Sequence, residues 1–404
     1  MTEAVVNTVR TAAECAARTG NSDFLLTPGP LTTSLSVKKA MLRDWGSRDP
    51  AFIELNADIR RRLVAVATGA DAASVDDGCI CVPVQGSGTF AIEATLGTVV
   101  PRQGKLLVLV NGAYGERMVK IMRYLGRDVI GLTCNENETH NLGEVQSTLR
   151  RDAAISHVAA VHCETTSGIL NPIEPIADLV HAEGRALIID AMSSFGALPL
   201  DAKALHATAV VASSNKCLEG VPGMGYAIIR RDVLGGCEGN AHSLALDLYD
   251  QWRAMEGNGQ WRFTPPTHVM AAFHQALIEH EAEGGVLGRY RRYSANCKVL
   301  IEGMQELGFQ PLLSDDRQAP IIVTFHMPAD ERFDFTSFYD RLAVRGYVIY
   351  PGKLTVAPSF RIGCIGQVMP EDMRNAVAVI GEELLAMGVK DCSPGGMAAA
   401  GGDA

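Results

Sequence analysis

The sequence of 404 residues lacks several features that define whole classes of protein. It has no uninterrupted apolar stretch of about 18 residues, the length that a membrane-spanning helix needs, so no membrane span is expected. It has 36 lysine and arginine residues against 46 aspartate and glutamate residues, and no long basic run of the kind that binds a nucleic-acid backbone. We therefore expect neither a membrane protein nor a nucleic-acid-binding protein.

The sequence also lacks a paired-cysteine framework. Its ten cysteines stand at irregular spacings. The first 20 residues contain acidic side chains and no continuous apolar segment, so we expect no secretory signal. Scattered cysteines in a chain of this size then indicate reduced core residues in a cytoplasmic protein. The histidines show no spacing typical of metal ligands, so no metal site is predicted.

What the sequence does contain, between about residue 78 and residue 230, is an alternation of short apolar runs with amphipathic segments. This alternation is typical of βαβ units and predicts a large α/β domain whose mostly parallel sheet is covered by helices. A last apolar run at 225–230 follows a short turn and could return antiparallel. The other expected strands are 79–84, 106–110, 129–132, 158–161, 186–189 and 209–212.

From about residue 286 the pattern changes and predicts a second, smaller α+β domain with an antiparallel sheet. A long helical segment at 289–307 precedes expected strands at 320–325, 347–350 and 360–363, with a helix at 335–345 between them. The predicted organisation is an N-terminal extension (1–23), a large domain (24–285) whose first segment contributes to the small domain, the small domain (286–392), and a disordered Gly/Ala-rich tail (393–404).

Ligands of open α/β sheets bind at the carboxyl ends of the strands, so the residues after each strand are the candidates. The first strand is followed by Gln85-Gly-Ser-Gly-Thr89 and then by a helical segment. Glycines let the backbone approach a ligand, and the N-terminus of a helix offers free N–H groups to a phosphate. The same residues could equally form an ordinary capped turn. The second strand ends at Asn111 rather than at an acid that would take a ribose hydroxyl, which argues against NAD.

Three further strand ends carry candidate ligands. Tyr114 stands among small residues and could lie flat on an aromatic ring or simply pack. Asp190 ends an apolar strand, where a carboxylate is costly to ionise unless a cation or hydrogen-bond donors meet it; the alternative is an aspartate that caps the next turn. Lys216 ends the following strand, and either reaches solvent or is held there for chemistry.

Together these candidates form the set that pyridoxal phosphate (PLP) needs: a lysine for the Schiff base, an acid for the pyridine nitrogen and a phosphate cradle. A desolvated lysine can act as a nucleophile and as a base. The set is far more specific than any of its members. A nicotinamide-dependent oxidoreductase using the glycines at 86 and 88 is an alternative that would leave Lys216 unexplained.

The sequence resembles the class V aminotransferases, a group of PLP-dependent enzymes of fold type I. The resemblance runs from about residue 24 to residue 385. It implies the fold of a type I PLP-dependent transferase: a large domain with a mostly parallel seven-stranded sheet and a smaller α+β C-terminal domain. It also implies a homodimer with shared active sites. Matching stretches include LLTPGPLTTS (25–34), QGSGTFAIEATLG (85–97), NGAYGERM (111–118), HCETTSGILNPI (162–173), DAMSSFGALPLD (190–201), SSNKCLEGVPG (213–223), WRFTPPTH (261–268) and FRIGCIG (360–366).

The resemblance implies a role for each residue around the reacting ring. Lys216 would form the Schiff base and move the proton. Asp190 would pair with the pyridine nitrogen, Tyr114 would stack on the ring, and Thr165 would bond the ring hydroxyl.

It also implies the anion-binding residues. Ser87, Gly88 and Thr89 would hold the cofactor phosphate, and Thr264 would reach it from the partner subunit. Arg361 would grip the carboxylate or phosphonate of the substrate, because the guanidinium fork suits both groups.

Within the group, the stretches DAMSSFG and SLALDLY favour enzymes that transfer the amino group of 2-aminoethylphosphonate to pyruvate in phosphonate catabolism. The products would be phosphonoacetaldehyde and L-alanine. An alanine– or serine–glyoxylate aminotransferase is the alternative. The extension before residue 24 and the stretch 43–49 differ from the pattern of the group, which leaves their roles open.

Overall fold

The structure is a computed structural model that describes residues 15–21, 23–70, 72, 78–352 and 357–395. These residues fall into two compact units. The small unit draws on the described residues within Met1–Leu35, Thr165–Gly168 and Arg291–Ala404, and the large unit on those within Ser36–Glu164 and Ile169–Tyr290. The domain limits expected from the sequence stay a prediction. The expected tail lies outside the described residues from residue 396 on, as do the first 14 residues of the expected extension.

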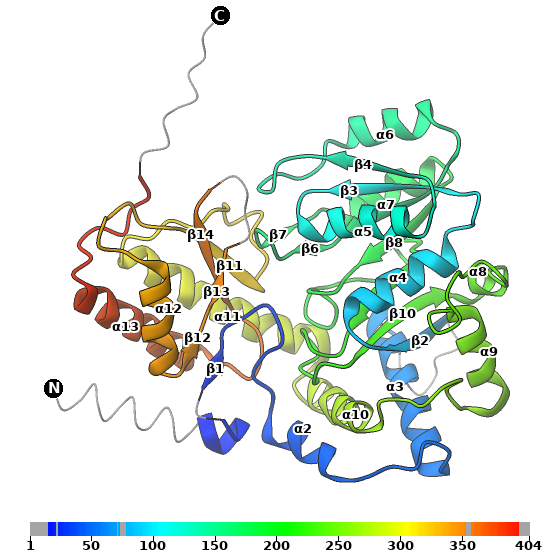
Figure 1. The fold of residues 1–404 in the computed structure, drawn as a ribbon, viewed down its shortest axis with the longest axis horizontal. Coiled ribbons are helices and arrows are strands. Elements are labelled where there is room, and N and C mark those ends of the chain that lie inside the picture. The colour runs from blue at the N-terminus through cyan, green and yellow to red at the C-terminus, as the bar shows by residue number, and fades with distance from the viewer. Residues whose placement is uncertain (1–14, 22, 71, 73–77, 353–356, 396–404) are drawn as a thin grey trace, which may run out of the picture. The chain divides into compact units, whose positions relative to one another are not determined.

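The large unit is built on a seven-stranded sheet in the order β2-β10-β9-β8-β5-β3-β4 (Figure 1). Only β10 is antiparallel to its neighbours, β2 and β9; the other pairs are parallel. The predicted mostly parallel sheet and the antiparallel return are therefore confirmed. Its strands are β2 (Cys79–Gln85), β3 (Lys105–Val110), β4 (Val129–Thr133), β5 (Ile155–Val161), β8 (Ala186–Asp190), β9 (Ala209–Ser213) and β10 (Met224–Arg230).

The central strands are apolar along their length because both faces of the sheet are covered. In β3, Leu107 and Leu109 belong to the core on one face, while Leu106, Val108 and Val110 belong to the core on the other. The helices also fall into two groups, one on each face of the sheet, as expected for strands that are apolar along their whole length. The first core includes side chains of α3 (Pro50–Thr68), α6 (Leu142–Arg151), α7 (Ile173–Ala182) and α10 (Thr267–Ala282); the second includes side chains of α4 (Gly88–Val99), α5 (Ala113–Tyr124), α8 (Arg231–Gly235) and α9 (Leu248–Asn258).

The small unit has the predicted antiparallel sheet, in the order β11-β14-β13. The expected strand at 347–350 is split, because its two halves pair with different partners. β12 (Tyr347–Val348) pairs in parallel with β1 (Phe24–Leu25), whereas β13 (Tyr350–Pro351) pairs with β14. The remaining strands are β11 (Ile322–His326) and β14 (Ser359–Gly363), and the helices are α12 (Phe335–Val344), α13 (Pro370–Met387) and the greater part of α11 (Gly285–Glu306).

The further short elements are α2 (Leu35–Lys39), the 3-10 helix η1 (Ala40–Leu42), the hairpin of β6 (Cys163–Glu164) with β7 (Ile169–Leu170), and a helical stretch at residues 15–19. Among the described helices, none combines the length and the apolar character needed to cross a membrane.

A buried arginine closes the C-terminal end of α4. Arg127 is 5% exposed, and its guanidinium donates to the carbonyl oxygens of Leu96 (3.0 Å), Gly97 (2.7 Å), Asn240 (2.7 Å) and Val100. The last carbonyls of a helix have no intrahelical partner, and a cation is favourable beside them. Arg127 thus fixes the far end of the helix whose first residues follow β2.

We predict that Arg127→Met lowers the free energy of unfolding by about 3 kcal/mol, because several buried carbonyls lose their donor. Urea denaturation measures this as a lower midpoint with an unchanged slope. Arg123→Met, the same change at an exposed position of α5, should stay within about 0.5 kcal/mol of the wild type. Equal midpoints for the two variants would contradict this role of Arg127.

Candidate active site

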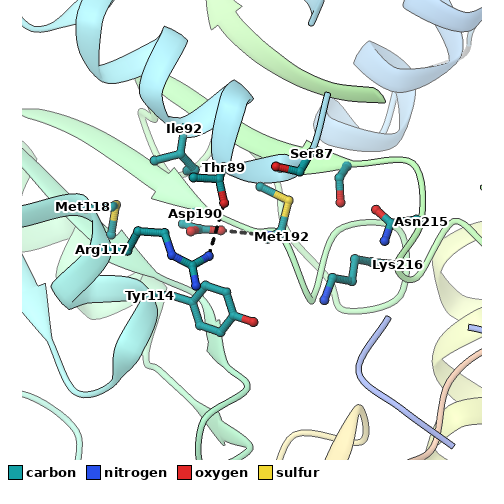
Figure 2. A pocket seen from close by; sticks show the side chains of 12 residues that line it. Ser87, Thr89, Ile92, Tyr114, Arg117, Met118, Asp190, Met192, Asn215 and Lys216 are labelled. Atoms are coloured by element: carbon teal, nitrogen blue, oxygen red, sulfur yellow. Dashed lines mark hydrogen bonds between the residues drawn. The ribbon is translucent and has the colours of Figure 1, made fainter. Parts of the chain in front are cut away.

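A cavity of about 150 Å³ lies in the large unit, beside the carboxyl ends of the parallel strands (Figure 2). Strands β2, β3, β8 and β9 point the same way, so the segments that follow them meet at one edge of the sheet. The cavity is lined by four such segments: Ser87, Gly88, Thr89 and Ile92; Tyr114, Arg117 and Met118; Asp190 and Met192; Ser213, Asn215 and Lys216.

The N-terminus of α4 forms one wall. Ser87 is the N-cap residue, yet its side chain makes no capping hydrogen bond, and the turn is closed by the N–H groups of Phe90 and Ala91 bonding to the Ser87 carbonyl. The first N–H groups of a helix have no intrahelical partner and attract anions. The capped-turn alternative therefore does not account for the Ser87 hydroxyl, which is exposed on the cavity.

Glycines shape this wall. A Cβ at position 88 would lie 2.3 Å from the sulfur of Met192, so only glycine fits without moving that side chain. Gly86 has φ +123°, a conformation that residues with a side chain rarely adopt. The turn from β2 into α4 thus brings backbone close to the cavity at the point where a phosphate would be held.

Asp190 both caps a turn and lines the cavity. It is 3% exposed, and its Oδ1 accepts a hydrogen bond from the Met192 N–H at 2.9 Å, as a turn-capping aspartate does. The same carboxyl lines the cavity. Burial raises the pKa of Asp190 to about 6, against the opposing effects of the Met192 N–H and of the charges of Arg117 and Lys216. The carboxyl is therefore mainly ionised at neutral pH.

Lys216 lies on a turn that a buried ion pair holds. Its side chain lines the cavity and the residue is 9% exposed. The Glu219 N–H bonds to the Lys216 carbonyl (2.8 Å), with Glu219 in the left-handed region at φ +57°. Arg289 pairs with Glu219 (3.2 Å) and Glu283 (2.7 Å), and also donates to the Cys217 carbonyl. The Arg289 and Glu219 side chains are 1% and 2% exposed, so the turn is anchored by charges away from water.

Arg117 is a cavity residue that the sequence analysis missed. Its Nη1 donates to Thr89 Oγ1 at 3.2 Å, and its guanidinium carbon lies 4.8 Å from the centroid of the Tyr114 ring. The available signal was its spacing, because residues three apart on a helix share a face and Tyr114 was already a candidate. An exposed arginine on an amphipathic helix otherwise indicates only a solvated face.

Three predicted site residues do not line this cavity. Thr165 and Arg361 belong to the small unit. There Arg361, 2% exposed, donates to the carbonyls of Thr165 (2.7 Å) and Pro351 (2.9 Å). Thr165 Oγ1 is buried and has no hydrogen-bond partner within the described part of the chain. Thr264 is exposed on the large unit and lines a second cavity, of about 510 Å³, together with Gln85.

The cavity residues fit PLP by their chemistry. They include a buried amine, a buried carboxyl with one oxygen committed to a turn, an aromatic ring, and a helix N-terminus with an uncapped serine. These are the groups that would attach the cofactor, pair with its ring nitrogen, cover its ring and hold its phosphate.

The comparison with known families decides the class. The profile of the family described as Aminotransferase class-V matches residues 82–366. The chain belongs to the class-V aminotransferases. The resemblance inferred from the sequence is thereby confirmed, and the nicotinamide-dependent alternative is excluded. A class-V aminotransferase is an enzyme, and its fold implies PLP as the cofactor.

This class-V aminotransferase has close curated relatives. It is 53% identical, over 368 residues, to the 2-aminoethylphosphonate–pyruvate transaminase of Pseudomonas fluorescens Pf0-1, a match that covers 91% of this chain and 98% of the relative. It is 52% identical, over 370 residues, to 2-aminoethylphosphonate–pyruvate transaminase 1 of Cupriavidus pinatubonensis, covering 92% and 96%.

Solved structures show the same fold. Alanine–glyoxylate aminotransferase from Nostoc sp. superposes with a TM-score of 0.81 at 25% identity, covering 90% of this class-V aminotransferase and 95% of that chain. Ureidoglycine–glyoxylate aminotransferase from Bacillus subtilis superposes with a TM-score of 0.82 at 21% identity, covering 91% and 94%. The predicted fold of type I PLP-dependent transferases is confirmed.

We predict that Arg289→Met lowers the free energy of unfolding by about 3 kcal/mol or more, because the buried carboxylate of Glu219 would lose the guanidinium that pairs with it. Chemical denaturation of the purified protein measures the loss. The double variant Arg289→Met/Glu219→Gln should be more stable than Arg289→Met alone, since the amide carries no charge. A double variant that is the less stable of the two would show that the pair does not act through its charges.

Proposed function

We propose that this protein transfers the amino group of 2-aminoethylphosphonate to pyruvate, with PLP as the cofactor, and releases phosphonoacetaldehyde and L-alanine. The observation that carries the proposal is the burial of Lys216 and Asp190 in one cavity at the carboxyl ends of parallel strands. The choice of substrates follows the names of relatives that are more than half identical to this chain over nine-tenths of its length.

When bound, PLP accepts the amino group and withdraws electrons from the carbon that loses a proton. We assign the attachment of the cofactor to Lys216 Nζ, which afterwards moves that proton as a general base and acid. The anchored turn suits this work, because the buried Arg289–Glu219 pair fixes the backbone on which Lys216 stands.

Asp190 would keep the ring nitrogen protonated. One oxygen, Oδ1, is held by the Met192 N–H, which orients the carboxyl and leaves Oδ2 for the nitrogen. Because Asp190 is itself buried, this charge–charge contact is stronger than it would be in solvent. Tyr114, another residue of the lining, would cover the ring.

The phosphate would be held by Ser87, Gly88 and Thr89, where the uncapped serine and the N-terminus of α4 converge on the cavity. We further propose that the protein works as a homodimer and that Thr264 of the partner subunit completes this phosphate site. The exposure of Thr264 on its own large unit supports that assignment.

Recognition of the substrate anion is assigned to Arg361, and the bond to the ring hydroxyl to Thr165. The Arg361 guanidinium is held by two backbone carbonyls and lies 5.1 Å from the ring centroid of Tyr350. A fixed planar fork can bind a carboxylate and a phosphonate alike, which is what two different substrates at one site require. The buried Thr165 hydroxyl supports its assignment, since such groups in proteins nearly always have a partner.

The test of the proposed function is the spectrum and turnover of the purified protein. We expect a near-visible absorbance band that shifts on addition of 2-aminoethylphosphonate, and L-alanine release when pyruvate is added. Lys216→Ala should lose the band and the turnover, because the cofactor has no amine to join. Lys120→Ala, at an exposed position of α5, should keep both. If the protein is coloured but turns over only alanine and glyoxylate, the proposed substrates are wrong, and the assignment to the class-V aminotransferases still holds.

We predict that Arg361→Lys raises KM for both 2-aminoethylphosphonate and pyruvate by about tenfold or more, because an ammonium cannot reproduce the planar fork. Steady-state kinetics with each substrate varied in turn measure the two values. Arg374→Lys, at an exposed position of α13, is the matched control and should leave both unchanged. A rise for only one substrate would show that Arg361 does not serve both anions.

A further inference from the structure

Arg117 lies close to three other residues of the cavity lining, Thr89, Tyr114 and Asp190. It projects from α5 one turn after Tyr114, and its guanidinium reaches toward Thr89 at the start of α4 (Figure 2). Its side chain therefore connects the two helices that follow β2 and β3. None of the roles assigned above to the cavity residues uses it.

Each contact of Arg117 fixes a group with an assigned role. The hydrogen bond of 3.2 Å to Thr89 Oγ1 sets the rotamer of a hydroxyl in the proposed phosphate site. The cation stands 4.8 Å from the centroid of the Tyr114 ring, within the range of a favourable cation–π contact. One side chain thus orients both the hydroxyl and the ring.

The charge of Arg117 also acts on Asp190. The groups that face this carboxyl are Arg117 from α5, Lys216 from the turn after β9, and the Met192 N–H. The titratable residues on the β5–β6 segment are His162, whose burial lowers its pKa to about 4, Cys163, whose burial raises its pKa well above the usual range, and Glu164, a buried acid whose Oε2 accepts the Tyr114 N–H at 3.1 Å. None of these three carries a positive charge near neutral pH, so the cations that face Asp190 are Arg117 and Lys216.

We propose that Arg117 is a positioning residue of the cofactor site, which orients Tyr114 and Thr89 and places a permanent positive charge toward Asp190. The proposal rests on the proposed function, because it concerns how the site receives PLP. Lys216 would be joined to the cofactor, whereas the Arg117 guanidinium takes no part in that bond and stays charged on the cavity lining at every pH of interest.

The pH dependence of cofactor binding separates this role from simple packing. Asp190 pairs with the protonated ring nitrogen only when it is ionised, which holds above its pKa. Burial raises that pKa to about 6 while the cation of Arg117 opposes the rise. Removing the cation must raise the pKa further, so cofactor binding must begin to fail at a higher pH than in the wild type.

The experiment titrates full-length protein, freed of cofactor, with PLP between about pH 5 and pH 8 and measures Kd by absorbance. For Arg117→Met we expect Kd to rise about tenfold at pH 8, and the acid limb of binding to move upward by about half a pH unit or more. Arg117→Lys keeps the charge and loses the planar group, so Kd should rise about threefold with the acid limb in place. Arg123→Met, on the same helix away from the cavity, should match the wild type.

The outcomes are distinct. Equal Kd values and acid limbs for Arg117→Met and Arg123→Met overturn the inference, and so does an acid limb that moves equally in Arg117→Lys and Arg117→Met. A wild-type protein that takes up no PLP overturns the proposed function and this inference with it. If Arg117→Met fails to fold, the Arg117→Lys titration decides alone, and a wild-type Kd in that variant overturns the positioning role.

Discussion

The cost of placing charged groups out of water governs the arrangement of the large unit. An aspartate and a lysine at the ends of neighbouring buried strands would each be unfavourable alone. The structure places both on one small cavity, with a backbone N–H on the carboxyl and an arginine facing it. The parallel sheet makes this possible, because strands that run together end together. The helices that cover both faces of the sheet bury the strands that carry the two residues.

A second buried pair of charges, Arg289 with Glu219, stabilises the turn on which Lys216 lies. Glu219 adopts a left-handed conformation that a residue with a side chain avoids unless its surroundings impose it. The ion pair and the bond from its N–H to the Lys216 carbonyl supply that constraint. Strain and buried charge thus accumulate on the turn that the proposed chemistry needs to be rigid.

The apolar runs were sufficient to predict the sheet, because strands covered on both faces must be apolar throughout. They also predicted which candidates would meet, since Ser87, Tyr114, Asp190 and Lys216 all follow strands that run in one direction. What the sequence could not show were contacts made across elements. Arg117 looked like one more exposed helix cation, and the anchor of the Lys216 turn comes from Arg289, far along the chain. The expected strand at 347–350 divides because its halves serve two sheets, which no local pattern reveals.

The two oxygens of the Asp190 carboxyl have different roles: Oδ1 stabilises the turn, and Oδ2 is assigned to the ring nitrogen. The contributions of this residue to folding and to chemistry can therefore be separated. Oδ1 accepts from the backbone and an asparagine carbonyl could do the same, so the turn after β8 does not itself demand an acid. The second oxygen, Oδ2, is an acceptor, whereas the corresponding NH₂ group of an asparagine is a donor. That NH₂ group would point a hydrogen at the protonated ring nitrogen and could not bond to it. An acid at residue 190 is therefore a requirement of the bound ring alone. Asp190→Asn would therefore keep the hydrogen bond of the turn and remove the negative charge that pairs with the protonated ring nitrogen.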